Sequence, residues 1–248
     1  MLVLVTGATA GFGAAIARAY VARGDRVIAA GRRQDRLAAL AAELGPALRP
    51  AVLDVRDRAA VAAFAAALPP DWAAVDVLVN NAGLGLGLEP AHQASLDEWE
   101  TMIDTNVKGV TYLVHAFLPG MVARGRGHVV NMSSVAADIP YPGGNVYGAT
   151  KAYVSQLSLN LRADLLGTPV RVTHVDPGLC GGTEFSNVRF RGDDARADKV
   201  YAGTQPLLPE DIAEAVVWVT TRPPHVNVNG LQLMPVCQAF GPTSVHRG

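Results

Sequence analysis

The chain has 248 residues, half of them hydrophobic, so it is long enough to bury a sizeable core. Its 21 basic and 22 acidic residues leave a net charge of −1, which argues against nucleic acid or an acidic membrane surface as a partner. No apolar run approaches the ~18 residues of a membrane span, and the amino terminus lacks the pattern of a signal peptide.

Seven short apolar segments predict β-strands, and alanine-rich helical stretches such as residues 14–23 and 37–44 separate them. The segments are residues 2–6, 26–30, 51–55, 76–80, 128–133, 170–177 and 231–235. Continuous apolar strands are typical of a parallel sheet that is covered on both faces. The alternation therefore predicts an α/β fold with a doubly wound parallel sheet. No linker-like tract interrupts residues 1–248, so we expect one domain.

A glycine-rich stretch, TGATAGFG, directly follows the first strand and leads into a helix. Its spacing differs from G-x-G-x-x-G, but glycines still let the backbone turn sharply and approach a pyrophosphate. The helix amino terminus would supply free N–H groups to the phosphates. The alternative is a tight turn without a ligand. The candidate cofactor-binding residues are Gly7, Ala8, Thr9, Ala10, Gly11, Phe12 and Gly13.

The second strand ends in AAGRR, where an NAD-dependent enzyme usually carries an acidic residue for the ribose 2′-hydroxyl. This chain has Arg32 and Arg33 instead. Guanidinium groups match a phosphate in geometry and charge, so the pair predicts NADP as the cofactor. The alternative is that both arginines are ordinary surface cations.

The ends of the third and fourth strands continue this pattern. Asp54 and Val55 close the third strand, where the adenine of a dinucleotide would lie. Asn81, Ala82 and Gly83 close the fourth, within the motif NNAG. Asparagine and glycine also form turns without a ligand. The motif supports a ligand site because three earlier strand ends also carry residues that are compatible with a ligand.

A helix is predicted to begin at Ser95, three residues before Glu98, which is the spacing of a capping box. An apolar stripe runs along this helix from Trp99 to Phe117. Asn106 lies close to that stripe, and a buried amide there would need hydrogen-bond partners. The alternative is a solvated edge of the stripe.

The candidate catalytic groups are a tyrosine, a lysine and a serine. Tyr147 and Lys151 form the only Tyr-x-x-x-Lys of the chain and share one face of a predicted helix. A nearby cation favours phenolate and lowers the tyrosine pKa, which suits proton transfer to or from an alcohol. Ser134 follows the fifth strand and would polarise a substrate carbonyl. Ser133 is its competitor, since adjacent strand residues face opposite ways.

Together these motifs resemble the short-chain dehydrogenase/reductase family in its classical form, over nearly the whole chain. The resemblance implies one Rossmann-type domain with strand order 3-2-1-4-5-6-7, usually assembled as a homotetramer. It implies that Tyr147 is the acid and base, that Lys151 holds the nicotinamide ribose, and that Ser134 binds the reacting oxygen. It further implies that Asn106 holds a water in a proton relay and that Asn81 contacts the cofactor.

The second half, from residue 140 to 194, resembles an NADP-dependent 3-hydroxy acid dehydrogenase subgroup of that family. The subgroup acts on serine, L-allo-threonine and malonic semialdehyde, which implies the same substrate class here. By this resemblance residues 177–200, the lid segment, close over the cofactor. Its implied cofactor contacts are Pro177, Gly178, Leu179, Cys180, Thr183 and Phe185.

Two arginines in the lid segment are candidates for binding the substrate carboxylate, Arg189 and Arg191. Their alternative is a surface or interface role. Cys180 is not expected to act as a nucleophile, because hydride transfer needs no covalent intermediate. The two cysteines and six histidines show no metal or disulfide spacing, so we expect a cytoplasmic enzyme without a metal.

Two other functions stay open at this stage. One is a general carbonyl or ketone reductase, for which Leu84, Leu86 and Leu88 would line the pocket. The other is a noncatalytic NADP-binding regulator, which would have no use for the Ser–Tyr–Lys set.

Overall fold

A computed structural model, which describes residues 1–241, shows one seven-stranded parallel sheet. Its strand order is β3-β2-β1-β4-β5-β6-β7, which confirms the expected fold class and order. The strands are β1 Leu2–Thr6, β2 Arg26–Gly31, β3 Leu48–Val52, β4 Val77–Asn80, β5 Gly127–Met132, β6 Val170–Pro177 and β7 Gly230–Leu233. β1 and β6 have the predicted bounds. The ends of β2, β4, β5 and β7 lie within two residues of the predicted ends.

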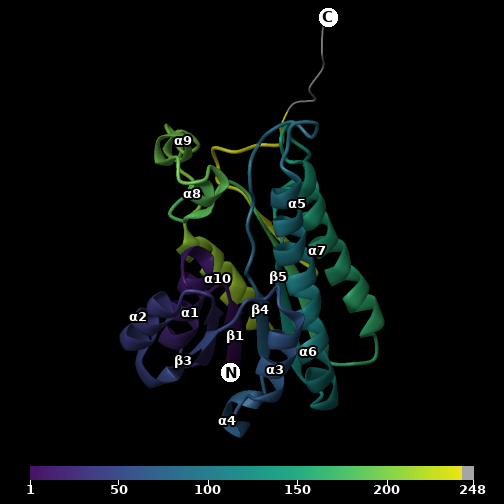
Figure 1. The fold of residues 1–248 in the computed structure, drawn as a ribbon. Helices are drawn as coiled ribbons and strands as arrows, with labels where there is room; N and C mark the ends of the chain where they lie inside the picture. Colours follow the sequence, from purple (N-terminus) through teal and green to yellow (C-terminus); the bar gives the residue numbers. More distant parts are fainter. Residues whose placement is uncertain (242–248) are drawn as a thin grey trace, which may run out of the picture.

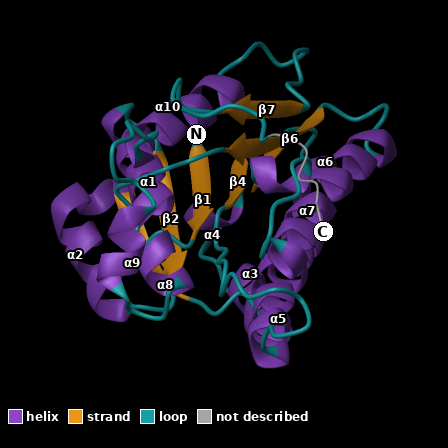
Figure 2. Cartoon of the chain, turned by 90° about the horizontal axis from the view of Figure 1, so that it is seen from above, coloured by secondary structure: helices purple, strands orange, loops and turns teal. Residues whose placement is uncertain are grey.

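Helices cover both faces of this sheet (Figures 1 and 2). The larger helices are α1 Gly11–Ala22, α2 Gln34–Leu44, α3 Arg58–Ala66, α5 Leu96–Ile103, α6 Val110–Ala123, α7 Asn145–Asp164 and α10 Pro209–Thr220. The short helical pieces are Gly45–Ala47, α4 Pro70–Ala73, Val135–Ala137, α8 Phe185–Arg189 and α9 Asp194–Lys199. Ser95 caps α5 as expected, since its Oγ accepts from the Glu98 N–H.

The strands read as continuous apolar runs because each face of the sheet packs against its own helical layer. Along β1, Val3 and Val5 join a cluster with residues of α1, α2 and α10. Leu2 and Leu4 join a second cluster with residues of α3, α6 and α7. Side chains alternate between faces along a strand, so both sets must be apolar for both layers to dock.

Two segments differ from the sequence-based expectation. The third strand, expected at residues 51–55, lies at Leu48–Val52, so Asp54 and Val55 follow the strand instead of closing it. The helix after Ser95 is not regular throughout. Between α5 and α6 lies a π-helical turn, Asp104–Gly109. Single π turns within α-helices are frequent at functional sites, and this one holds Asn106.

The carboxyl ends of all seven strands meet at one edge of the sheet, because every neighbouring pair is parallel. The loops after β1, β4, β5 and β6 therefore come together, although they are far apart in sequence. Helices α8 and α9 lie over this edge (Figure 1). In doubly wound sheets, ligands bind at the carboxyl ends of the strands. The fold thus places the predicted site residues on one side.

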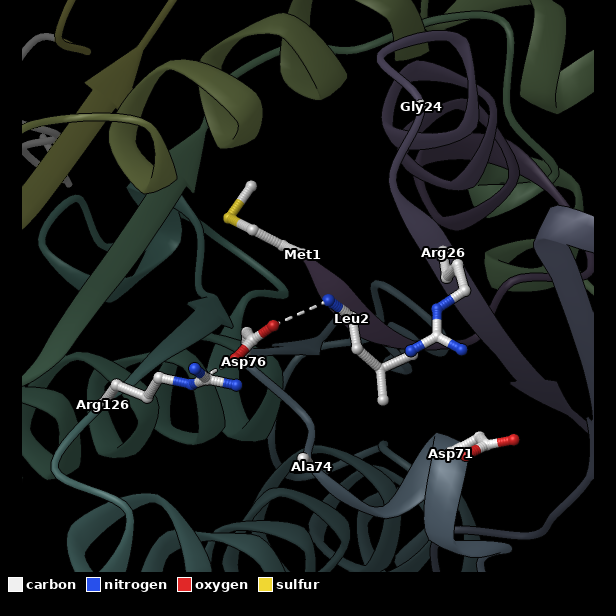
Figure 3. A pocket seen from close by; sticks show the side chains of 8 residues that line it. All are labelled: Met1, Leu2, Gly24, Arg26, Asp71, Ala74, Asp76 and Arg126. Carbon is white, nitrogen blue, oxygen red and sulfur yellow. Dashed lines mark hydrogen bonds and ion pairs between the residues drawn. The ribbon is translucent and has the colours of Figure 1, made fainter.

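At the opposite, amino-terminal edge lies a hollow of about 390 Å³ (Figure 3). The carboxylate of Asp76 accepts a hydrogen bond from the Leu2 N–H at 2.9 Å and pairs with Arg126 at 3.0 Å. The amino group of Met1 binds Asp25 at 2.6 Å. These contacts anchor the start of β1, so we assign this hollow a structural role.

Within residues 1–241, no helix is both long and apolar enough to cross a membrane.

His128 in β5 is buried among the strands, and its Nε2 lies 2.8 Å from the Thr173 hydroxyl. That hydroxyl donates to the Val228 carbonyl, so Nε2 carries the proton and donates to Thr173. Burial, aided by the charge of Arg171, lowers the pKa of His128 to about 3. The histidine is therefore neutral in the folded protein at neutral pH.

Because unfolded His128 binds a proton below about pH 6.5, its contribution to stability should fall as the pH drops from 6.5 toward 3. Replacing it as His128→Gln keeps a donor to Thr173 and removes the titration. Between pH 7.5 and 5.0 the wild type should lose about 2 kcal/mol more unfolding free energy than the variant. Urea unfolding at both pH values measures the difference, and equal losses would contradict this explanation.

Candidate active site

Tyr147 and Lys151 lie on the first turns of α7 and are both buried. The Lys151 Nζ lies 5.8 Å from the centre of the Tyr147 ring, and it donates to the Met132 carbonyl at 2.9 Å. The two side chains therefore lie close together on one face of α7, which the i, i+4 spacing predicts. Met132 is the last residue of β5, so the lysine joins α7 to the strand that precedes Ser134.

The two neighbouring serines have different partners. Ser133 Oγ donates to the Lys151 carbonyl and lies 2.8 Å from the Ser155 hydroxyl, so it is engaged with α7. Ser134 Oγ accepts from the Ala136 N–H at 3.1 Å and lies 3.4 Å from the Pro177 carbonyl. The Ser134 hydroxyl also lies near enough to the Tyr147 phenol to lower the pKa of that phenol. Of the two, Ser134 is the one placed beside Tyr147.

Burial dominates the protonation of this site. It raises the pKa of the Tyr147 phenol to about 12, although Ser134 and Arg189 act to lower it. It lowers the pKa of Lys151 to about 8, although the Asp176 carboxylate acts to raise it. In the protein alone, burial therefore outweighs any lowering of the Tyr147 pKa by the lysine. At neutral pH the phenol is protonated and ready to donate.

Asn106 is fully buried in the π turn and uses both ends of its amide. Its Nδ2 donates to the Leu84 carbonyl at 2.8 Å and to Thr150 Oγ1 at 3.0 Å. Its Oδ1 accepts from the Leu84 N–H at 2.9 Å. The solvated alternative is thus excluded. Asn106 ties the loop after β4 to α7, beside Lys151.

The glycine-rich loop turns in the way the sequence predicts. Gly7 has a φ of 66°, which favours glycine, and a Cβ at Gly13 would overlap the Gly7 carbonyl oxygen. The first turn of α1 has no side-chain cap, since its N-cap residue is Ala10. Its N–H groups are thus left for a ligand, which fits the pyrophosphate of a dinucleotide.

The Asn81 side chain is hydrogen-bonded to the end of β1. Its Nδ2 donates to the Thr6 carbonyl at 2.9 Å, so it fastens the loop after β4 to the end of β1. Thr6 Oγ1 accepts from the N–H groups of Asn81 and Ala82, both at 3.1 Å. Ala82 and Gly83 continue this loop toward Asn106, whose Oδ1 lies 3.2 Å from a Cβ built at Gly83.

The two arginines after β2 differ in environment. Arg32 is exposed, whereas Arg33 is partly buried against the glycine-rich loop through Thr9. Asp54 pairs with Arg56 at 2.6 Å, and this bond lowers the pKa of its carboxyl. Val55 is buried against Gly109. Arg33 thus lies beside the glycine-rich loop, where the phosphate of NADP would be recognised.

The beginning of the lid segment is anchored by backbone pairing. Gly178 N–H donates to the Leu233 carbonyl at 2.7 Å, and Leu179 N–H donates to Gln238 Oε1 at 2.6 Å. The backbone of Cys180 pairs with that of Leu207 in an isolated parallel β-bridge. Burial raises the pKa of the Cys180 thiol to about 12. The thiol is therefore a poor nucleophile, as expected.

The second part of the lid segment lies over the catalytic residues. The rings of Phe185 and Tyr147 are 5.7 Å apart. The guanidinium carbon of Arg189 lies 4.9 Å from the centre of the Tyr147 ring, and its Nη2 donates to Tyr141 Oη at 3.3 Å. Arg189 Nε is buried without a partner among the described residues. A buried donor without a partner is unusual, and a ligand with an acceptor oxygen would satisfy it.

Arg191 lies elsewhere. It is exposed, has a φ of 57°, and its guanidinium pairs with Glu98 at 2.7 Å. The structure therefore brings Arg189 to the site and keeps Arg191 outside it.

Sequence reasoning missed three residues that shape the site, namely Tyr141, Thr150 and Glu184. Tyr141 binds Arg189, Thr150 binds Asn106, and Glu184 binds Arg33. The only local signal was an acidic residue between Thr183 and Phe185, which complements the arginine pair in charge.

The geometry combines a protonated phenol, an adjacent hydroxyl and a buried amine at the edge where a dinucleotide would bind. Such a set can donate a proton to a carbonyl oxygen, or accept one from an alcohol. Residues 1–193 match the model of the short chain dehydrogenase family. The chain therefore belongs to this family of oxidoreductases.

Individual relatives are similar over their full length. The chain is 61% identical over 247 residues to the NADP-dependent 3-hydroxy acid dehydrogenase YdfG of Escherichia coli (strain K12), covering 100% of both chains. It is 50% identical to the serine 3-dehydrogenase of Agrobacterium fabrum, covering 99% of this chain and 98% of that one. The closed form of serine dehydrogenase complexed with NADP+ is similar in structure, with a TM-score of 0.99, 60% identity and 100% of both chains covered.

The contacts of Asn106 predict what its removal would do. Asn106→Leu leaves the N–H and the carbonyl of Leu84 without their partners, so unfolding free energy should fall by about 2–4 kcal/mol. Turnover should fall as well, because the loop beside Lys151 loses its support. Thr150→Val leaves both Leu84 groups paired but removes the Asn106 bond and the bond from the Thr150 hydroxyl to the Tyr147 carbonyl, so it should cost about 1 kcal/mol. Urea unfolding and steady-state rates test this, and equal losses in the two variants would argue against the tether.

Proposed function

We propose that this protein transfers hydride between NADP(H) and short 3-hydroxy acids, of the class of L-allo-threonine, L-serine and 3-hydroxypropionate with malonic semialdehyde. The observation that carries the proposal is the position of Arg189. Its guanidinium lies over the Tyr147 ring with a buried N–H that has no partner in residues 1–241. An anion-binding group beside the proton donor fits a substrate with a carboxylate near its hydroxyl.

In this proposal Tyr147 gives a proton to the carbonyl oxygen, or takes one from the hydroxyl, while Ser134 holds the same oxygen. Lys151 and Asn106 support the proton path and the loop beside it. NADP(H) supplies or accepts the hydride when bound, and its oxidised nicotinamide carries a positive charge. That charge favours phenolate, so it opposes the burial that raises the Tyr147 pKa.

The choice of NADP rests on Arg32 and Arg33 after β2, where no acidic residue is available for a ribose hydroxyl. The cradle of Gly7 and Gly13 would hold the pyrophosphate, together with the first turn of α1. The similarity to a protein named NADP-dependent 3-hydroxy acid dehydrogenase, over its whole length, supports both cofactor and substrate class.

Further properties belong to the proposal. By resemblance to its family, the chain acts as a homotetramer, and two cysteines without metal or disulfide spacing suit the cytoplasm. Residues 1–248 would form one cofactor-binding domain, in which the lid segment closes over the ligands. Residues 242–248 lie outside the part that the structure describes.

The main alternative is a general NADPH-dependent carbonyl reductase. An apolar cluster around Tyr147 favours it, because Leu84, Leu86 and Phe185 pack there and would suit an uncharged ketone. Leu88 lies further along the same loop and is not part of this cluster. A noncatalytic regulator is a weaker alternative, because a binding protein has no need for Ser134, Tyr147 and Lys151 to converge.

Removing the phenolic hydroxyl tests catalysis. Tyr147→Phe should lower turnover by about 10²–10⁴-fold, because no other group is placed to transfer the proton. Binding of NADPH should be retained, which fluorescence titration measures. Unchanged turnover would refute the role of Tyr147, and a regulator would show no turnover in either protein.

Removing the guanidinium of Arg189 tests the substrate class. Arg189→Gln should raise the KM for 3-hydroxy acids by about 10- to 100-fold, since one charge-assisted contact is lost. The KM for simple alcohols should change little. Arg191→Gln is the matched control in the same segment, because Arg191 pairs with Glu98 instead. Similar KM changes in both variants, or none in Arg189→Gln, would favour the general reductase.

A further inference from the structure

Three consecutive residues of the lid segment contact three different parts of the site. The Thr183 side chain lies against the glycine-rich loop, 3.1 Å from a Cβ built at Gly11. Phe185 packs on the ring of Tyr147. Between them Glu184 binds Arg33, the residue after β2 that faces the glycine-rich loop. The proposed chemistry gives Glu184 no role.

The bonds of Arg33 fix its guanidinium from two sides. Its Nε and Nη2 donate to Thr9 Oγ1 at 3.2 and 2.9 Å. Its Nη1 donates to Glu184 Oε2 at 2.8 Å. A guanidinium has five N–H groups, so N–H groups on Nη1 and Nη2 remain for a phosphate. One of the two supports comes from the glycine-rich loop and the other from the lid segment.

Charge explains why an acidic residue helps a phosphate site here. Arg32, Arg33 and Arg36 are close in sequence and repel one another. Glu184 lies between two of them, because its Oε1 is also 3.9 Å from Arg36 Nη2. Asp35 is the other carboxylate in this group, 3.9 Å from Arg36. Three cations and two carboxylates leave an excess of one positive charge for the phosphate.

We propose that Glu184 is a positioning residue for recognition of the nucleotide 2′-phosphate. Its carboxylate holds Arg33 in place when the lid segment is closed, so closure and selectivity for the phosphorylated nucleotide share one ion pair. An arginine that is already ordered loses less entropy when it binds phosphate. This inference rests on the proposed function, because it needs NADP as the cofactor.

Glu184→Gln removes the charge and keeps the shape. The Kd for NADP+, measured by calorimetry, should rise by about two- to fivefold, since both partners are partly exposed. The Kd for NAD+, which lacks the phosphate, should stay the same. The lid segment has four trypsin sites, at Arg189, Arg191, Arg196 and Lys199. NADP+ should protect these sites less well in the variant than in the wild type.

Glu43→Gln is the matched control, because Glu43 pairs with Arg18 at similar exposure and neither side chain bonds to the lid segment. The Kd values of this variant for NADP+ and NAD+, and its protection from trypsin by NADP+, should equal those of the wild type. In Arg33→Gln, the further change Glu184→Gln should have no additional effect on the Kd for NADP+, since the group it positions is gone.

Several outcomes would overturn the inference. Equal weakening for NADP+ and NAD+ would show a general effect on the lid segment, and unchanged affinities with unchanged protection would show no role for Glu184. Tighter binding of NADP+ would show that Glu184 competes with the phosphate. If the variant keeps the wild-type preference for NADP+, only the positioning role fails. If the wild type has no such preference, the proposed cofactor fails too.

Discussion

The burial of Tyr147 beside Lys151 is the constraint on which the rest of the site depends. Burial disfavours charge on both groups, and it moves the pKa of the phenol to about 12 and that of the amine to about 8. Their neighbours reduce this penalty. The Met132 carbonyl accepts from Lys151, while Ser134 and Arg189 favour phenolate. At neutral pH the protein alone therefore presents a protonated phenol at this site.

The segments around these two buried groups include loops that the sheet does not pair. Their backbone groups depend on side chains for hydrogen bonds. Thr6 supplies one such tether, because its hydroxyl accepts from two N–H groups of the loop after β4. Asn106 supplies the other, from the π turn, by binding both backbone groups of Leu84. Both tethers act on the loop that lies between the cofactor edge and Lys151.

The lid segment covers the site mainly through ion pairs and contacts with aromatic rings. Arg189 packs against the rings of both Tyr147 and Phe185, and Arg191 pairs with Glu98 on α5. Glu184 extends the same segment to Arg33 beyond the glycine-rich loop. Exposed ion pairs are individually weak, whereas the beginning of the segment is held by backbone hydrogen bonds to Leu207.

The sequence by itself determined the sheet, its order through the family resemblance, and the pairing of Tyr147 with Lys151. Apolar runs and the helical repeat are local properties, so they predict strands and a shared helix face without knowledge of distant contacts. Only the tertiary structure decided which of Arg189 and Arg191 enters the site, because α8 ends between them and the chain turns away at Arg191. The tertiary structure also places Arg33 beside Glu184, 151 residues away, and it determines that the pKa of Tyr147 is raised. Burial and long-range contacts arise from how the whole chain packs, and no local pattern of residues encodes them.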